Sequence, residues 1–191
     1  MKYDTVVEEL RKRLQNEVSE KRLLHSEGVL DFAVSLANHY GVPDYMVKIA
    51  ALAHDTFRGR TGNELFVKAV EMGIRPDRFE SNKPKLLHGK VSAEDLRLRY
   101  PDLNNIDIIA KAVQYHTTGY PFKEPVGKIL FLSDSLEESR YYSGIDKLRK
   151  LAFEDIDVAF FEIVKNKIRF AVDKEGFVLP NTVKTYNAFL L

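Results

Sequence analysis

Apolar residues recur at three- and four-residue spacing through most of the chain, and strict alternation of apolar and polar positions over five or more residues is hard to find. The first spacing is typical of an amphipathic α-helix, whereas a half-buried strand alternates with a period of two. The pattern therefore predicts an all-α fold, a helical bundle of about eight to ten helices.

Glycine, proline and capping residues interrupt this pattern and predict where helices begin and end. Ser19 is a good N-cap, Gly41 can adopt the left-handed conformation that ends a helix, and Asp44 can cap the next one. Residues 56–85 contain several glycines and prolines, so we expect a flexible insertion over the core, in which residues 63–72 could form a short helix. The other expected helices cover residues 3–18, 19–40, 44–55, 89–100, 106–117, 125–138, 145–153, 155–174 and 181–191.

No repeat, low-complexity tract or linker divides the 191 residues, so we expect one domain over residues 1–191. Its core is expected to span about 19–175. The last helix, at about 181–191, would be capped by Asn181 or Thr182.

Ionisable residues interrupt the apolar stripes of several predicted helices. Three, four and seven positions before His54 and before His116 the residues are all apolar, and before Asp134 they are apolar or glycine. His25 shares its stripe with the apolar residues that follow it. Because residues at these spacings share one helix face, all four side chains are expected to point toward the core.

Two interpretations of these residues remain open. A single histidine on an apolar face is more often a core residue with one hydrogen bond than a ligand. A buried carboxylate such as Asp134 or Asp55 is harder to explain, since an unpaired one costs several kcal/mol or becomes protonated. Neutral imidazoles together with compensating carboxylates supply what a divalent metal ion needs, so the pattern favours a metal site between the central helices.

Composition narrows the chemistry of such a site. The chain has no cysteine, which excludes disulfides, thiolate zinc sites, iron–sulfur clusters and a cysteine nucleophile, and leaves nitrogen and oxygen as ligands. Lys plus Arg number 29 against 28 Asp plus Glu, a formal charge of +1, so no nucleic-acid or membrane partner is expected. The charged N-terminal stretch and the lack of a long apolar run predict a cytoplasmic protein.

The order of six residues resembles the HD superfamily of metal-dependent phosphohydrolases: His25, His54, Asp55, His88, His116 and Asp134. Further segments resemble the bacterial YqeK-type group, the symmetrical bis(5'-nucleosyl)-tetraphosphatases that split diadenosine tetraphosphate into two ADP. These segments are residues 22–29, 50–55, 87–89, 116–119, 133–140, 148–152 and 180–182. The likeness covers roughly residues 21–187 and implies an HD-type helical domain with this hydrolase activity.

The resemblance also implies a ligand set. The metal, most often iron, with manganese, cobalt, nickel or zinc as alternatives, would be held by His25, His54, Asp55 and Asp134. Asp55 would bridge to a second ion near His88 and His116. In the other interpretation a single ion binds, and these two histidines contact phosphate or protonate the leaving ADP. Asp55, His88 and His116 are therefore the expected catalytic residues.

Nucleotide contacts implied by the resemblance fall on Arg22, Arg58, His88, His116, Thr117, Arg140 and Thr182. The chain departs from the pattern at two positions. Arg58 stands where lysine is expected, which keeps the positive charge and allows two hydrogen bonds to phosphate. Leu179 stands before Pro180, where the family usually has a histidine, and this puts base or ribose contacts in question.

Two other functions stay open at this point. One is an HD-type phosphohydrolase acting on a different nucleotide. The other is a non-catalytic domain in which the metal stabilises the fold and a nucleotide is sensed without turnover. The apolar tail at residues 188–191 could dock on the core or on a second subunit, so a homodimer is possible.

Overall fold

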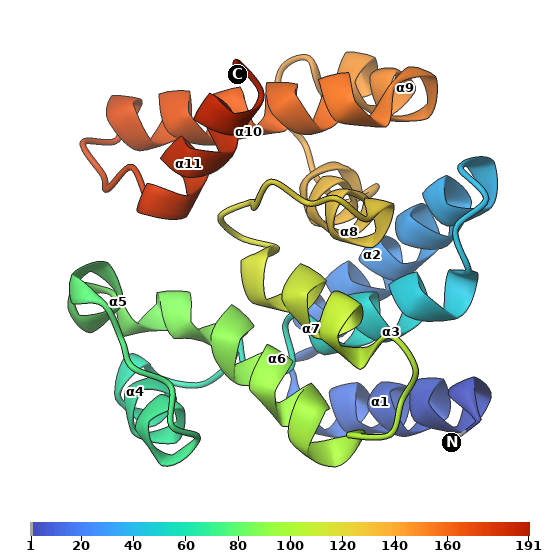
Figure 1. Ribbon diagram of the computed structural model, residues 1–191, viewed down its shortest axis with the longest axis vertical. Coiled ribbons are helices and arrows are strands. Elements are labelled where there is room, and N and C mark those ends of the chain that lie inside the picture. The colour runs from blue at the N-terminus through green and yellow to red at the C-terminus, as the bar shows by residue number, and fades with distance from the viewer. Residues whose placement is uncertain (1) are drawn as a thin grey trace.

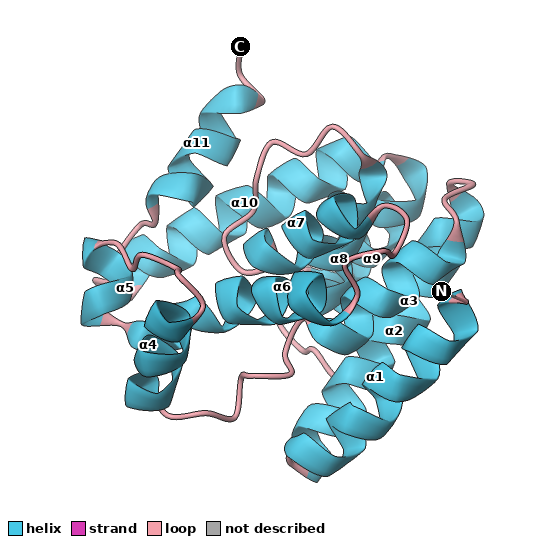
Figure 2. Cartoon of the chain, turned by 60° about the horizontal axis from the view of Figure 1, so that its bottom comes forward, coloured by secondary structure: helices cyan, strands magenta, loops and turns pink. Residues whose placement is uncertain are grey.

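The computed structural model describes residues 2–191, which form eleven α-helices, one 3₁₀ helix (η1) and no strand (Figures 1 and 2). None of the helices in this range combines the length and apolar character needed to cross a bilayer. In chain order they are α1 (Tyr3–Glu17), α2 (Glu20–His39), α3 (Asp44–Ala53), α4 (Gly62–Glu71), α5 (Arg78–Asn82), η1 (Pro84–Leu87), α6 (His88–Arg99), α7 (Ile106–Tyr115), α8 (Pro125–Leu136), α9 (Ile145–Glu154), α10 (Ile156–Asp173) and α11 (Pro180–Ala188).

The predicted all-α class is confirmed, and most predicted helices end within two residues of the observed ones. The short helix expected at residues 63–72 is present as α4, and the largest difference lies in the rest of residues 56–85, where α5 and η1 replace expected irregular chain and raise the number of helices above ten. Both α4 and α5 begin with a capping box, Thr61 with Glu64 and Asp77 with Glu80. Reciprocal side-chain bonds satisfy the first backbone N–H groups there and stabilise the start of both short helices.

Two of the predicted caps are wrong, and in both cases proline is the reason. Pro43 occupies the N-cap of α3 and makes no side-chain capping bond, while Asp44 is the first helical residue. The last helix begins at Pro180, not after Asn181 or Thr182, since proline is favoured at the first helical position. Gly41 does adopt the left-handed conformation, with φ of 66°.

Four helices form the centre of the molecule: α2, α3, α7 and α8 pack against one another, with α1 against α3 and α6 against α7 (Figure 1). Helix α10 packs on α8, and both α9 and α11 pack on α10. The main core includes Val6, Leu10 and Leu14 of α1, which are fully buried or nearly so. Helix α1 therefore contributes a complete apolar stripe to the main core.

A second, smaller apolar cluster lies under α4 and η1. It consists of Phe57, Leu65, Ala69, Leu87 and Val91, all buried. These residues join the segment after α3 to the start of α6. The segment of residues 56–87 therefore has its own packing and holds the beginning of α6 in place.

Helices α6 and α7 approach closely at Gly89. A Cβ atom at this position would lie 3.0 Å from the carbonyl oxygen of Gln114 and 3.4 Å from Cε1 of His116. The missing side chain lets the N-terminus of α6 come against the C-terminus of α7. As a result His88, the first residue of α6, faces His116, which follows the last residue of α7.

Candidate metal centre

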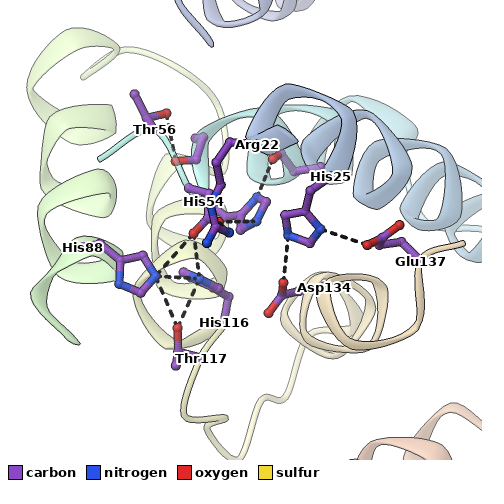
Figure 3. Close-up of polar contacts among 12 residues, drawn as sticks. Arg22, His25, His54, Thr56, His88, His116, Thr117, Asp134 and Glu137 are labelled. Atoms are coloured by element: carbon purple, nitrogen blue, oxygen red, sulfur yellow. Dashed lines mark hydrogen bonds and ion pairs between the residues drawn. The ribbon is translucent and has the colours of Figure 1, made fainter. Parts of the chain in front are cut away.

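Histidines and aspartates from five helices meet in one buried cluster (Figure 3). His25 comes from α2 and Asp134 from α8. The other four residues lie at helix ends: His54 and Asp55 follow α3, His88 begins α6 and His116 follows α7. The structure brings together all six residues whose order suggested a site: His25, His54, Asp55, His88, His116 and Asp134.

Three of the histidines are oriented in the same way. Nδ1 of His54, His88 and His116 lies 2.6, 2.7 and 2.7 Å from the carbonyl oxygen of the residue three positions earlier. A carbonyl oxygen only accepts, so Nδ1 carries the hydrogen and donates it. In the neutral ring the lone pair is then on Nε2, and all three Nε2 atoms point into the cluster (Figure 3).

These three lone pairs have few donors among the described residues: the hydroxyl of Thr117 lies near Nε2 of His88 and of His116, and it has a single hydrogen to donate. Nε2 of His54 is buried without any hydrogen bond. Nε2 of His88 lies 3.1 Å from Nε2 of His116, so two lone pairs face each other unless a proton or a cation lies between them. An unsatisfied buried acceptor costs about 1–3 kcal/mol. A bound cation would relieve both problems, and this is why the cluster fits a metal ion.

The possible ligand atoms form two groups that share one residue. His25, His54 and Asp55 form one, and Asp55, His88 and His116 form the other, with the ligand atoms of each within 4.8 Å of one another. Oδ1 of Asp55 lies 3.4 Å from Nε2 of His88 and 3.7 Å from Nε2 of His116. Asp55 is thus placed to bridge two adjacent positions. Nitrogen and oxygen donors of this kind suit iron, manganese and zinc among others.

Asp134 contacts the cluster through its ion pair with His25. Its Oδ1 atom lies 3.1 Å from Nε2 of His25 and accepts a hydrogen bond of 2.9 Å from Arg140. It belongs to neither of the two three-residue groups in the arrangement observed. The predicted set of His25, His54, Asp55 and Asp134 is therefore assembled, but Asp134 is paired with a histidine and an arginine.

Glu137, for which the sequence predicted no role, orients His25 from the other side. Its Oε1 atom lies 3.0 Å from Nδ1 of His25, and the backbone N–H of Ser139 donates to Oε2 over 2.7 Å. A Cβ atom on Gly28 would lie only 2.7 Å from Oε2, so this carboxylate fits because position 28 is glycine. A carboxylate on the second nitrogen of a histidine fixes the ring for metal binding. Glu137 follows the last residue of α8, so helical spacing from Asp134 could not have placed its side chain.

The electrostatics differ among the histidines: burial lowers the pKa of His25, but its contacts with Asp134 and Glu137 outweigh burial and raise that pKa. Burial lowers the pKa of His54, and burial together with the nearby His116 lowers the pKa of His88 to about 3. Burial by itself would raise the pKa of Asp55, but His54, His116 and His88 outweigh it and hold that pKa far below its usual range. At neutral pH, His54 and His88 therefore keep a free lone pair beside a charged carboxylate, which is the protonation state a metal ion requires.

Basic side chains surround these carboxylates. Nη1 of Arg22 donates to Oδ2 of Asp55 over 2.7 Å, and Arg140 reaches both Asp134 and the neighbourhood of Glu137. The positive charge of Arg58 contributes to the low pKa of His88, so this residue lies near the other end of the cluster.

Thr117 joins the cluster, whereas Thr182 lies beside it. Oγ1 of Thr117 lies 3.2 Å from Nε2 of His116 and 3.4 Å from Nε2 of His88. Thr182 is buried, and its hydroxyl donates to the carbonyl oxygen of Thr118 over 2.9 Å. A pocket adjoins the cluster at this point, and its walls come from α5, η1, the first turn of α6, the end of α7 and the start of α11. Its lining includes Phe79, Tyr115, Thr117, Thr118, Leu179 and Asn181.

A helical domain that converges buried histidines and aspartates on one polar cavity, ringed by arginines, has the site of a metal-dependent hydrolase of phosphate compounds. Comparison with known families agrees. The HD domain family matches residues 22–139, more than half of the chain. The chain therefore belongs to the HD domain family and is an HD-superfamily phosphohydrolase, which confirms the resemblance.

Curated relatives cover almost the whole chain. The protein named "Bis(5'-nucleosyl)-tetraphosphatase, symmetrical" from Bacillus subtilis is 31% identical over 91% of this chain and 92% of its own length. Proteins of the same name are 32% identical in Halalkalibacterium halodurans, over 91% of both chains, and 27% identical in Staphylococcus aureus, over 96% of this chain and 94% of that protein.

A solved structure supports the fold over the same length. The crystal structure of a "predicted HD superfamily hydrolase involved in NAD metabolism" from Clostridium acetobutylicum is similar with a TM-score of 0.86 and 32% identity. The match covers 98% of this chain and 96% of that one. The arrangement of helices around the cluster is therefore shared with an experimentally determined protein.

Proposed function

We propose that the chain hydrolyses dinucleoside tetraphosphates symmetrically, converting diadenosine tetraphosphate and one water into two ADP. The observation that carries this proposal is the pair of buried ligand groups sharing Asp55. It occurs in a chain whose relatives over nine-tenths of its length are named symmetrical tetraphosphatases. The central P–O–P bridge would break, and each half would leave as a nucleoside diphosphate.

His25, His54, Asp55 and Asp134 would hold the first metal ion, and Asp55, His88 and His116 a second one. Iron is the metal we favour, with manganese, cobalt, nickel or zinc as alternatives. When bound, the ion supplies positive charge that polarises the phosphoryl group and lowers the pKa of a water molecule. The unpaired Nε2 atom of His54 and the low pKa values of His88 and Asp55 support this assignment.

If a single ion binds, His88 and His116 have another role. Their Nδ1 atoms are held by backbone carbonyl groups, so only Nε2 can exchange a proton with the substrate. Because Nε2 of His88 carries a lone pair at neutral pH, it would first accept a proton from the attacking water and would then pass it to the leaving phosphate oxygen. Thr117 lies against both Nε2 atoms and would orient the same phosphate through its hydroxyl.

Arg22, Arg58 and Arg140 would bind the polyphosphate chain. Arg22 and Arg140 are each anchored on a carboxylate of the cluster, yet 36% and 41% of their side chains remain exposed, so both can also reach a bound anion. A planar guanidinium group offers two parallel hydrogen bonds to phosphate.

The nucleoside would lie in the pocket beside Thr117 and the tail that contains Thr182. Leu179, which replaces the usual tail histidine, lines that pocket and offers no hydrogen bond to a base or ribose. We therefore expect weak discrimination between bases. A cytoplasmic location and a homodimer stay predictions from the sequence.

The test begins with metal-free protein reloaded separately with Fe(II), Mn(II), Co(II), Ni(II) or Zn(II) and offered diadenosine tetraphosphate. Two ADP per substrate on chromatography is the expected result, and equal amounts of ATP and AMP would show asymmetric cleavage instead. His54→Ala should abolish the reaction. His39→Ala is the matched control, because His39 packs against Tyr40 and Phe153 outside the cluster.

The same assay separates the alternatives. The name of the Clostridium protein refers to NAD metabolism, so NAD, which contains a pyrophosphate bridge, should be offered alongside the tetraphosphate. Preferential cleavage of NAD or of a mononucleotide would point to another HD-type phosphohydrolase. Tight nucleotide binding without turnover under all five metals would point to a sensing domain.

A further inference from the structure

A lysine occupies the buried stripe of α10. The residues three, four and seven positions before Lys167 are Val164, Ile163 and Phe160, and all three are buried in the core. Lys167 therefore lies on the face of α10 that packs against α8, at a position where the helical period calls for an apolar residue. A lysine is unexpected at such a position, because removing an ammonium group from water costs free energy.

The side chain of Lys167 extends toward the cluster. Its Nζ atom lies 4.8 Å from the centre of the ring of Phe131, a fully buried residue of α8. Asp134 follows Phe131 by three residues and so lies one helical turn further along the same face of α8. In agreement with this placement, the charge of Lys167 contributes to the low pKa of Asp134.

No acceptor neutralises this ammonium group within residues 2–191. Asp134 pairs with Arg140 and His25, while the neighbouring Lys165 pairs with Glu162. The face of the Phe131 ring is the one partner that the structure gives to Lys167. Arg58, near His88, likewise has no ion pair among the described residues, and in Figure 3 His88 and Asp134 lie at opposite sides of the cluster.

We propose that Lys167 is a further phosphate-binding residue, which contacts the polyphosphate chain on the Asp134 side of the cluster while Arg58 contacts it on the His88 side. A tetraphosphate has two phosphates on each side of its central bridge. Cations on both sides would centre the chain over the cluster, and this position determines which bridge is cut. The identity of this anion as the polyphosphate chain of a substrate rests on the proposed function.

Calorimetry with inorganic tripolyphosphate on metal-free protein tests the anion site without relying on turnover. Lys167→Met keeps the length and apolar stem of the side chain and removes its charge. It should weaken tripolyphosphate binding about tenfold, the size expected for one charge-assisted contact. Lys167→Arg should bind within about threefold of the unaltered protein. Lys174→Met is the matched control, because Lys174 ends the same helix and is exposed.

Kinetics and thermal unfolding separate substrate binding from a structural role. With metal-loaded protein and diadenosine tetraphosphate, Lys167→Met should raise KM about tenfold and change kcat less than threefold. Its melting temperature should stay the same or rise, because a partly buried charge has been removed. A lower melting temperature with unchanged KM and unchanged tripolyphosphate binding would mean that Lys167 only fills space, and would overturn the inference.

The two proposals fail in different ways. Unaltered protein that cleaves the tetraphosphate, together with a Lys167→Met variant of equal KM and equal tripolyphosphate affinity, retains the proposed function and rejects the role of Lys167. Unaltered protein that is inert toward every dinucleotide, but binds tripolyphosphate through Lys167, rejects the tetraphosphatase activity and retains the anion site.

Discussion

The four central helices and the segment of residues 56–87 are built in different ways. In α2, α3, α7 and α8, long apolar stripes form the main core, and histidine and aspartate interrupt them only around the cluster. The segment of residues 56–87 has a small apolar cluster, and capping boxes start both of its α-helices. In the centre, side chains bury apolar surface and form the candidate metal site. In the segment, the capping side chains stabilise the start of each helix.

This difference indicates what each region contributes. In the centre, polar groups are buried at an energetic cost, and a ligand is needed to offset it. In the segment, the side-chain caps are exposed or half-buried, and each stabilises only its own helix. Changes in the centre should therefore affect metal binding and activity, and changes at the caps of α4 and α5 should affect stability alone.

The largest effect is expected for Asp55→Asn. The substitution keeps the shape of the side chain but removes the charge that both ligand groups share. We expect kcat/KM to fall by about a thousandfold or more, or about 4 kcal/mol of transition-state stabilisation, and bound metal to decrease. Metal content by mass spectrometry and steady-state kinetics measure both. Asp107→Asn, at an exposed carboxylate paired with Arg97, is the control and should leave both unchanged. Full activity in Asp55→Asn would show that the centre is not the reacting site.

A smaller effect is expected for Gly28→Ala. The new Cβ atom would overlap Oε2 of Glu137, whose shift would release His25. Loss of such an orienting contact typically lowers metal affinity by 10–100-fold, so we expect a decrease of about that size in a Co(II) titration followed by absorption. Gly59→Ala is the matched control, since a Cβ atom there has no atom within 4 Å. Equal affinities in the two variants would contradict the role of Glu137.

The smallest effect is expected in the segment. Thr61→Ala removes the hydroxyl that accepts from the backbone N–H of Glu64, and should lower the free energy of unfolding by about 1 kcal/mol in urea denaturation. Ser19→Ala provides the comparison, because Ser19 occupies the N-cap of α2 without a side-chain capping bond and should cost less. Both variants should retain kcat and KM. A large loss of activity in Thr61→Ala would show that the segment and the centre are coupled.

Helical period alone locates most of the cluster. His25, His54, His116 and Asp134 lie on apolar stripes, and all four are in the cluster. The same test would have found Lys167, which is preceded by a complete apolar stripe. It could not place His88, which lies at a helix start, where no preceding turn defines a face. Glu137 follows the last residue of α8, so its orientation depends on the chain leaving that helix.

Sequence by itself determined the helical class, most helix boundaries and the absence of thiolate ligands, because these follow from local spacing and residue type. Only the tertiary structure decided which atoms face one another. The two ligand groups share Asp55 because α3, α6 and α7 meet at the same place. Glu137 reaches His25 because Gly28 leaves room between α2 and the end of α8. Such contacts join residues far apart in the chain, and local propensity does not encode the distances between them.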